Sequence, residues 1–149
     1  MDHMRWPIIR RRLGPAQATD CGRRRDPLKE RLMGLSTHAL DTVHGCPAAG
    51  MEVALYATDG ESARLVKAFR LNQDGRDPEG LVLAGEALVR GSYRLVFDVA
   101  DYFRSKGLVL ERPAFLERVR LDFGVAQPQA HWHVPLLVSP WSYTTYRGS

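Results

Sequence analysis

The sequence lacks the features that mark disulfide-rich, membrane-spanning and nucleotide-binding proteins. Its 149 residues include only two cysteines, Cys21 and Cys46, which give no disulfide framework. They suit either a reducing compartment or a protein that is indifferent to redox state. No apolar run approaches the ~20 residues of a membrane-spanning helix. The chain also has no GxGxxG or GxxxxGKS/T loop and no CxxC pair, the minimum features of dinucleotide, P-loop and zinc-ribbon sites. We therefore expect no membrane partner and no nucleotide or zinc cofactor.

Basic residues are concentrated at the beginning of the chain. Residues 1–31 contain nine basic and four acidic side chains, whereas residues 32–149 contain 12 basic and 13 acidic ones. The formal net charge of +4 is therefore a property of the first segment. The rest of the chain is nearly neutral, so its charge does not indicate a nucleic-acid partner.

We divide the chain into an Arg-rich leader, residues 1–33, and one domain, residues 34–149, which is long enough to form a core. The leader is expected to be disordered, or to reflect a start assigned too early in a protein that begins at Met33. Its apolar patch, residues 6–9, is shorter than the ~7–15-residue core of a secretory signal. Without such a signal, the expected location is cytoplasmic.

Alternating apolar residues and glycine-containing turns predict a β-protein. In residues 51–57, apolar side chains occupy every second position, as in a strand with one buried face. Only residues 99–106 indicate a helix, which Gly107 would end in a left-handed conformation. Strands that recur between turns, together with one short helix, predict an all-β sandwich. The other expected strands are residues 65–71, 93–99, 118–125, 131–138 and 142–147, with turns at 59–60 and 72–75.

The C-terminus follows an apolar run, residues 134–138, and an aromatic segment, residues 141–146. Chain ends are usually polar and frayed. This composition therefore predicts an end that is tied into a sheet. Such an end would bring together a phenol, a guanidinium, a hydroxyl and a terminal carboxylate from Tyr146-Arg147-Gly148-Ser149.

Three further polar segments interrupt the alternation and are candidates for chemistry. They contain His38 in an otherwise strand-like segment, Arg76 after a tight turn, and the pair His131 and His133, whose side chains share one strand face. Singly, each has a simpler interpretation, namely a packed histidine, a solvated arginine or an adventitious metal site. Three histidines could bind zinc, but no carboxylate or cysteine completes a conventional ligand spacing. We therefore expect acid–base chemistry and no metal.

Together and in this order, these segments resemble the transthyretin-like 5-hydroxyisourate hydrolases. The resemblance covers about residues 34–149 and does not include the leader. Its last part is similar to the C-terminal signature that separates these hydrolases from true transthyretins, which are hormone carriers on the same scaffold. The matching segments are residues 35–42 with 45–48, 72–76, 131–140 and 142–149.

The resemblance implies a transthyretin-like Greek-key sandwich of two sheets, assembled as a homotetramer with active sites in a channel between dimers. It implies hydrolysis of 5-hydroxyisourate, the product of urate oxidation, to 2-oxo-4-hydroxy-4-carboxy-5-ureidoimidazoline without a cofactor. His131 does not correspond to the family's catalytic histidine and is left as a supporting residue. The implied catalytic residues are His38, Arg76, His133 and Ser149, and the implied substrate contacts are His38, Arg76, Tyr146 and Arg147.

Hydrolysis of a cyclic amide requires that water lose a proton and that the departing nitrogen gain one. Histidine suits this task because its unperturbed pKa, ~6.5, lies near neutral pH. One of His38 and His133 is expected to deprotonate water, and the sequence does not distinguish them. Arg76 can hold substrate oxygens and stabilise an oxyanion, while Tyr146 and Ser149 position substrate or water. A nucleophilic Ser149 is the less favoured alternative, because no nucleophile elbow or acidic partner surrounds it.

Two other functions remain open from the sequence alone. A transthyretin-type carrier would bind a small aromatic ligand without turning it over, and a structural sandwich module would do neither. Transthyretins lack both the opening histidine and the terminal tetrapeptide, so the presence of His38 and of residues 146–149 favours the hydrolase.

Overall fold

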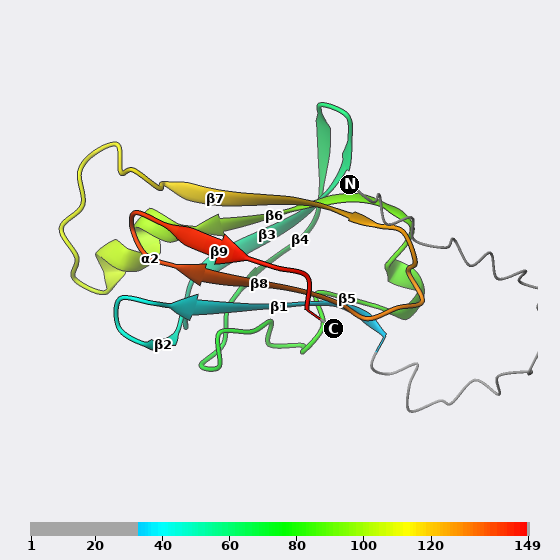
Figure 1. The fold of residues 1–149 in the computed structure, drawn as a ribbon, viewed down its shortest axis with the longest axis horizontal. Coiled ribbons are helices and arrows are strands. Elements are labelled where there is room, and N and C mark those ends of the chain that lie inside the picture. Colours follow the sequence, from blue (N-terminus) through cyan, green and yellow to red (C-terminus); the bar gives the residue numbers. More distant parts are fainter. Residues whose placement is uncertain (1–32, 149) are drawn as a thin grey trace, which may run out of the picture.

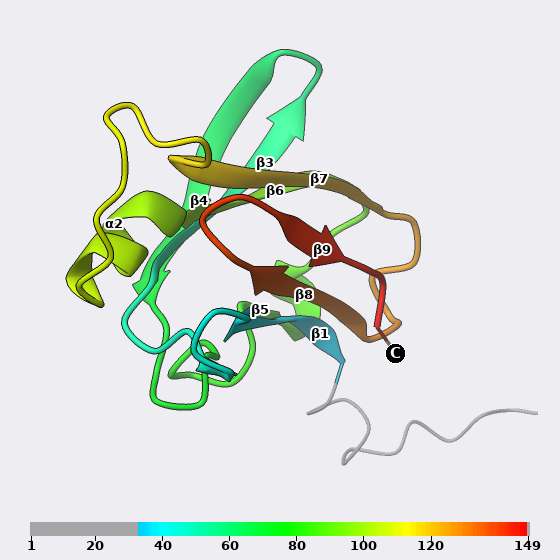
Figure 2. The same ribbon diagram turned by 60° about the vertical axis from the view of Figure 1, so that its left-hand side comes forward.

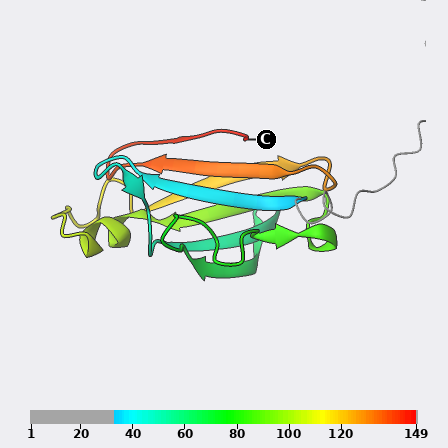
Figure 3. The same cartoon turned by 90° about the horizontal axis from the view of Figure 1, so that it is seen from below.

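A computed structural model describes residues 33–148, which form two β-sheets packed face to face (Figures 1 and 3). The expected leader lies outside the described residues, apart from Met33, and so does Ser149 at the other end. Within residues 33–148, no helix is both long and apolar enough to cross a membrane.

The first sheet has the strand order β2-β1-β8-β9, and β5 also pairs with β1. β8 lies between β1 and β9 (Figure 2). The β1–β8 pair is parallel, whereas the other pairs of this sheet are antiparallel. The strands are β1 Gly34–Asp41, β2 Cys46–Pro47, β5 Leu83–Ala84, β8 Trp132–Val138 and β9 Tyr143–Thr145.

The second sheet has the order β4-β3-β6-β7, and all of its pairs are antiparallel. The helix α2, Val99–Ser105, follows β6 directly, and Gly107 comes after its end with a φ of +89°. One 3₁₀ turn, η1 Gly85–Ala87, follows β5. The strands of this sheet are β3 Glu52–Asp59, β4 Ser62–Arg70, β6 Gly91–Asp98 and β7 Arg118–Val125.

The architecture confirms the predicted all-β sandwich of two sheets with one short α-helix. The predicted strand 118–125 coincides with β7, and the predicted helix 99–106 coincides with α2 to within one residue. The last strand is shorter than predicted. It ends at Thr145, and the chain then returns to β8 only through a single bridge between Gly148 and His133. The strands β2 and β5 were not predicted, because two residues are too few to show an alternation.

The core consists of apolar side chains that alternate along the strands of both sheets. Leu35, Ala39 and Leu136 are completely buried on the inner face of the first sheet, and Leu55 and Phe97 lie on the second sheet. Because side chains alternate between faces, the intervening residues of β1 and β8 point to the outer face of the first sheet. The parallel pairing places residues from near the two ends of the domain side by side. On the outer face of the sheet, these neighbouring residues are not part of the core.

A buried carboxylate fixes the end of β1. Asp41 accepts hydrogen bonds from the main-chain N–H groups of Val43 and His44, at 2.9 and 3.0 Å. Its other oxygen lies 2.6 Å from Nδ1 of His44 and 3.0 Å from the hydroxyl of Tyr102, which donates from helix α2. Burial alone would raise the pKa of Asp41, but the hydrogen bonds from His44, Tyr102 and Val43 outweigh it and lower that pKa. The cluster therefore joins β1, the following turn and the helix around one ionised group.

We expect Tyr102→Phe to lower the free energy of unfolding by about 1–3 kcal/mol, because it leaves the Asp41 carboxylate buried with one partner fewer. Chemical denaturation at pH 7 measures this change. Tyr56→Phe is the matched control, since the Tyr56 hydroxyl makes no hydrogen bond within residues 33–148.

The lowered pKa of Asp41 stabilises the fold above the pKa of the unfolded carboxyl, and this contribution is lost as the pH falls through the folded value. Acid unfolding should therefore begin at a higher pH in Tyr102→Phe, and equal stability of the two variants would contradict this role.

Candidate active site

Four polar side chains gather on the outer face of the first sheet, along β1 and β8. Ser36 pairs in register with His133, and His38 pairs with Pro135. Since the side-chain period is two, Ser36 and His38 share this face of β1, while His131 and His133 share it on the β8 side. The histidines are half-buried and Ser36 is buried. The sequence segments predicted to carry chemistry at the two ends of the domain are thus neighbours in space.

The turn that carries Arg76 is held against β1. The side-chain oxygen of Asn72 accepts hydrogen bonds from the main-chain N–H groups of Asp74 and Arg76, at 2.9 and 3.0 Å. The main-chain N–H of Ala39 donates to the carbonyl of Gly75 at 2.9 Å. Gly75 has a φ of +70°, and a Cβ atom there would lie 2.5 Å from the Ala39 carbonyl oxygen. Glycine is therefore required for this close approach.

Arg76 reaches back from this turn to His38. Its Nη2 atom lies 3.3 Å from Nδ1 of His38. A guanidinium can only donate hydrogen bonds, so Nδ1 of His38 is the acceptor and the proton of the neutral ring is on Nε2. Burial lowers the pKa of His38, and the charge of Arg76 lowers it further against the opposing effect of Asp74. His38 is therefore a neutral imidazole whose Nδ1 lone pair faces Arg76.

His133 is held from the β1 side by Ser36. The Ser36 hydroxyl oxygen lies 2.8 Å from Nδ1 of His133 and 3.0 Å from Nε2 of His131. Burial lowers the pKa of His133, and the charges of Arg76, His131 and His38 lower it further. Nε2 of His133 makes no hydrogen bond within residues 33–148. His133 is therefore neutral at neutral pH, and its Nε2 atom is on the side of the ring away from Ser36.

The C-terminal segment lies against His133, as the prediction of a tied-down end requires. The main-chain N–H of Gly148 donates to the carbonyl of His133 at 2.8 Å. A Cβ atom on Gly148 would come within 2.7 Å of Cδ2 in the His133 ring. Gly148 therefore lies so close to the imidazole that a side chain at this position would collide with the ring. Ser149, one of the predicted catalytic residues, lies outside the described residues.

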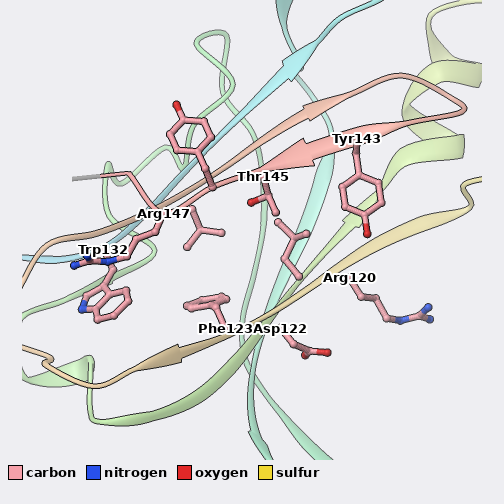
Figure 4. Close-up of a pocket in the computed structure, with 10 residues that line it drawn as sticks. Arg120, Asp122, Phe123, Trp132, Tyr143, Thr145 and Arg147 are labelled. Carbon is pink, nitrogen blue, oxygen red and sulfur yellow. The ribbon is translucent and has the colours of Figure 1, made fainter. Parts of the chain in front are cut away.

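Arg147 does not join the cluster formed by His38, Arg76 and His133. Its guanidinium lies over the ring of Trp132, 4.4 Å from the ring centroid, and Figure 4 shows both side chains at the same pocket. This pocket has a volume of about 360 Å³ and opens between β9 and β7. The exposed Tyr146 also borders it. Of the predicted site residues, the structure therefore brings His38, Arg76 and His133 together, and it separates the Arg147 side chain from them.

Ser36 is a polar residue of the site that the sequence did not single out. Its spacing of two from His38 would have placed it on the same strand face. Its contacts with His131 and His133 depend on the register between β1 and β8, which is a long-range property. Within residues 33–148, no three His, Cys, Asp or Glu side chains converge in a way that could hold a metal ion. The arrangement offers a lone pair on one histidine, a second neutral histidine and a guanidinium.

Residues 35–148 match the HIUase/Transthyretin family. The chain is 51% identical over 115 residues to the 5-hydroxyisourate hydrolase of Ralstonia nicotianae, covering 77% of this chain and 97% of that protein. It is 49% identical over 115 residues to the 5-hydroxyisourate hydrolase of Pseudomonas aeruginosa, covering 77% of this chain and 90% of that protein. The solved structure of (S)-allantoin synthase matches with a TM-score of 0.73 and 44% sequence identity. The match covers 80% of this chain but only 45% of the (S)-allantoin synthase chain. Both the sequence matches and the two-sheet architecture lead to one conclusion: this chain belongs to the HIUase/Transthyretin family.

Proposed function

We propose that this protein hydrolyses 5-hydroxyisourate to 2-oxo-4-hydroxy-4-carboxy-5-ureidoimidazoline in urate degradation. The observation that supports this most strongly is the contact between Arg76 and His38 beside His133, on a face that contributes nothing to the core. The relatives from Ralstonia nicotianae and Pseudomonas aeruginosa, both named 5-hydroxyisourate hydrolase, support the same reaction. No cofactor is proposed, because proton transfer and oxyanion stabilisation are sufficient for amide hydrolysis.

His38 takes the proton from the attacking water in the mechanism that we propose. Its Nδ1 lone pair faces Arg76 over a long hydrogen bond of 3.3 Å. When the guanidinium turns to the substrate carbonyl, this lone pair becomes available to water. The water oxygen bonds to the carbonyl carbon while its proton passes to Nδ1. The C–N bond of the ring then breaks, and the same proton passes from His38 to the departing nitrogen.

The remaining predicted residues bind and orient the substrate in this proposal. Arg76 donates to the carbonyl oxygen and stabilises its developing negative charge. Tyr146 and Ser149 position substrate or water through their hydroxyl groups. The family resemblance implies that Arg147 is a substrate contact. Because its side chain stacks on Trp132, we propose that Arg147 contributes by holding the terminal segment in place.

The protein assembles as a homotetramer in our proposal. Both edge strands on one side of the sandwich are unpaired within residues 33–148, because β9 pairs only with β8 and β7 pairs only with β6. The aromatic side chains of Trp141, Tyr143 and Tyr146 are exposed around β9, at 63%, 45% and 57%. Exposed strand edges and exposed aromatic side chains favour association with another chain.

The activity test follows the ultraviolet absorbance of 5-hydroxyisourate as urate is oxidised enzymatically. The wild-type protein should accelerate its loss, and Arg76→Gln should reduce the catalysed rate by about 10²–10³-fold because it removes a charged oxyanion donor. Arg70→Gln is the matched control, since Arg70 is an exposed arginine at the end of β4 that pairs with Glu52 of β3, in the second sheet. Ligand binding without any acceleration by the wild type would instead indicate a transthyretin-type carrier.

The pH dependence of kcat/KM should report the lowered histidine pKa values. Because burial and Arg76 lower the pKa of His38, its neutral form should persist below the ordinary pKa of ~6.5. We expect kcat/KM to stay constant as the pH falls through this value and to decline only at lower pH. In Arg76→Gln, the decline should begin at a higher pH because the neighbouring positive charge is gone. A wild-type midpoint at or above ~6.5 would be inconsistent with a neutral His38 held in this way.

The assembly is tested separately from the activity. Sedimentation equilibrium or native mass spectrometry should give four times the 16.8 kDa mass of one chain. A monomeric mass for the fully active hydrolase would contradict the proposed homotetramer.

A further inference from the structure

We infer that Ser36 and His131 hold His133 as a neutral hydrogen-bond donor, whose Nε2–H stabilises the oxyanion formed when water attacks. In this assignment His133 does not deprotonate water, and Ser36 and His131 are positioning residues. The inference rests on the proposed hydrolysis and assigns different roles to the two catalytic histidines.

One hydroxyl group lies between two imidazoles. Ser36 is 6% exposed, and its oxygen is 2.8 Å from Nδ1 of His133 and 3.0 Å from Nε2 of His131. A serine hydroxyl has a single hydrogen, so it can donate to only one of these nitrogens. The hydrogen bonds must therefore run either from His131 through Ser36 to His133, or in the opposite direction.

The second nitrogen of His131 decides between the two directions. Nδ1 of His131 is buried and has no hydrogen-bond partner within residues 33–148. If Ser36 donated to Nε2 of His131, the proton of neutral His131 would have to be on Nδ1, as a buried N–H without an acceptor. Buried side-chain donors without an acceptor are rare in proteins. We therefore assign the direction in which Nε2–H of His131 donates to Ser36 and Ser36 donates to Nδ1 of His133.

This direction fixes the proton of His133. A neutral imidazole whose Nδ1 accepts a hydrogen bond carries its proton on Nε2. Ser36 holds Nδ1 on one side of the ring, and Gly148 lies so close to the Cδ2 edge that a Cβ atom there would collide with it, so the ring has little room to rotate. Nε2–H is thus the group that His133 presents at the outer face of the sheet.

The surroundings of His133 also disfavour a second proton. Within residues 33–148, the groups that act on the pKa of His133 are Arg76 from the turn, His131 from the segment before β8 and His38 from β1. Each of them, when charged, lowers this pKa in addition to the effect of burial. A neutral imidazole N–H is a fixed donor that needs no reorganisation when the carbonyl oxygen becomes negative. His133 and Arg76 then donate hydrogen bonds to the carbonyl oxygen, while His38 transfers the proton from water to the departing nitrogen.

Glutamine substitutions separate a donor from a base. The amide N–H₂ of glutamine can reach the position of Nε2, but it cannot accept a proton from water. His133→Gln should therefore retain kcat within about tenfold of the wild type, whereas His133→Leu should lose about 10²–10³-fold. His38→Gln should lose about 10²–10⁴-fold, because its role is that of a base. If His133→Gln is as inactive as His133→Leu while both remain folded, the assignment of His133 as a donor is wrong.

The hydroxyl of Ser36 is tested by a matched set of variants on β1. Ser36→Ala should reduce kcat about tenfold with KM unchanged within about twofold, and Ser36→Thr should restore kcat. Thr37→Val is the control, because Thr37 also donates from β1 to β8, to the Val134 carbonyl at 2.7 Å, but from the opposite face. An unchanged kcat in Ser36→Ala, or an equal loss in Thr37→Val, would overturn the positioning role.

Nitrogen-15 NMR of the histidine side chains identifies the tautomer in the wild-type protein, so this test does not depend on the activity of any variant. The signals of His133 are assigned by their loss in His133→Gln. We expect the proton on Nε2 of His133 at neutral pH, and a proton on Nδ1 would overturn the inference. A wild-type protein with this tautomer but without activity would instead contradict the proposed function, so the two failures are distinguishable.

Discussion

The parallel pairing of β1 with β8 is the constraint on which both the core and the candidate site depend. Seven residue pairs, from Leu35 with Trp132 to Asp41 with Val138, join the two ends of the domain. On the inner face, this register buries Ala39 and Leu136 in the core. On the outer face, it places Ser36 beside His133. A slip by one residue would exchange the faces of β1, exposing the core residues and burying His38. Burial of the core therefore also selects the geometry of the histidines.

Main-chain contacts attach the other parts of the site to this strand pair. The turn of Arg76 is bonded to β1 through Gly75, and the C-terminal segment is bonded to β8 through Gly148. In both places a Cβ atom would collide with the strand or with the His133 ring. The approach is close because neither residue has a side chain. Such contacts bring Arg76 and the segment that ends at Gly148 close to the histidines.

The sequence predicted the fold, and the structure places three of the candidate residues, His38, Arg76 and His133, together, but the contacts around them were not foreseen. Alternation was sufficient for the long strands, such as β7, because one buried face imposes a period of two. The same period places Ser36 on the face of His38, but it does not reveal which strand lies beside β1, and so the contact with His133 was not foreseen. The position of Arg147 was not predictable for a similar reason. Its stacking on Trp132 depends on where β9 ends, which local pattern does not determine.

The charge of Arg76 lowers the pKa of both histidines, so the different roles that we propose for them must come from their hydrogen-bond partners. A guanidinium cannot accept a proton, so beside His38 it forces the lone pair onto Nδ1, and its charge lowers the pKa of both rings. Two neutral imidazoles can then be distinguished only by their partners. His38 faces a donor that can turn to the substrate, whereas His133 faces a hydroxyl fixed between two strands. Hydrolysis by water needs one mobile proton and one fixed donor, and the different partners of the two rings provide this asymmetry.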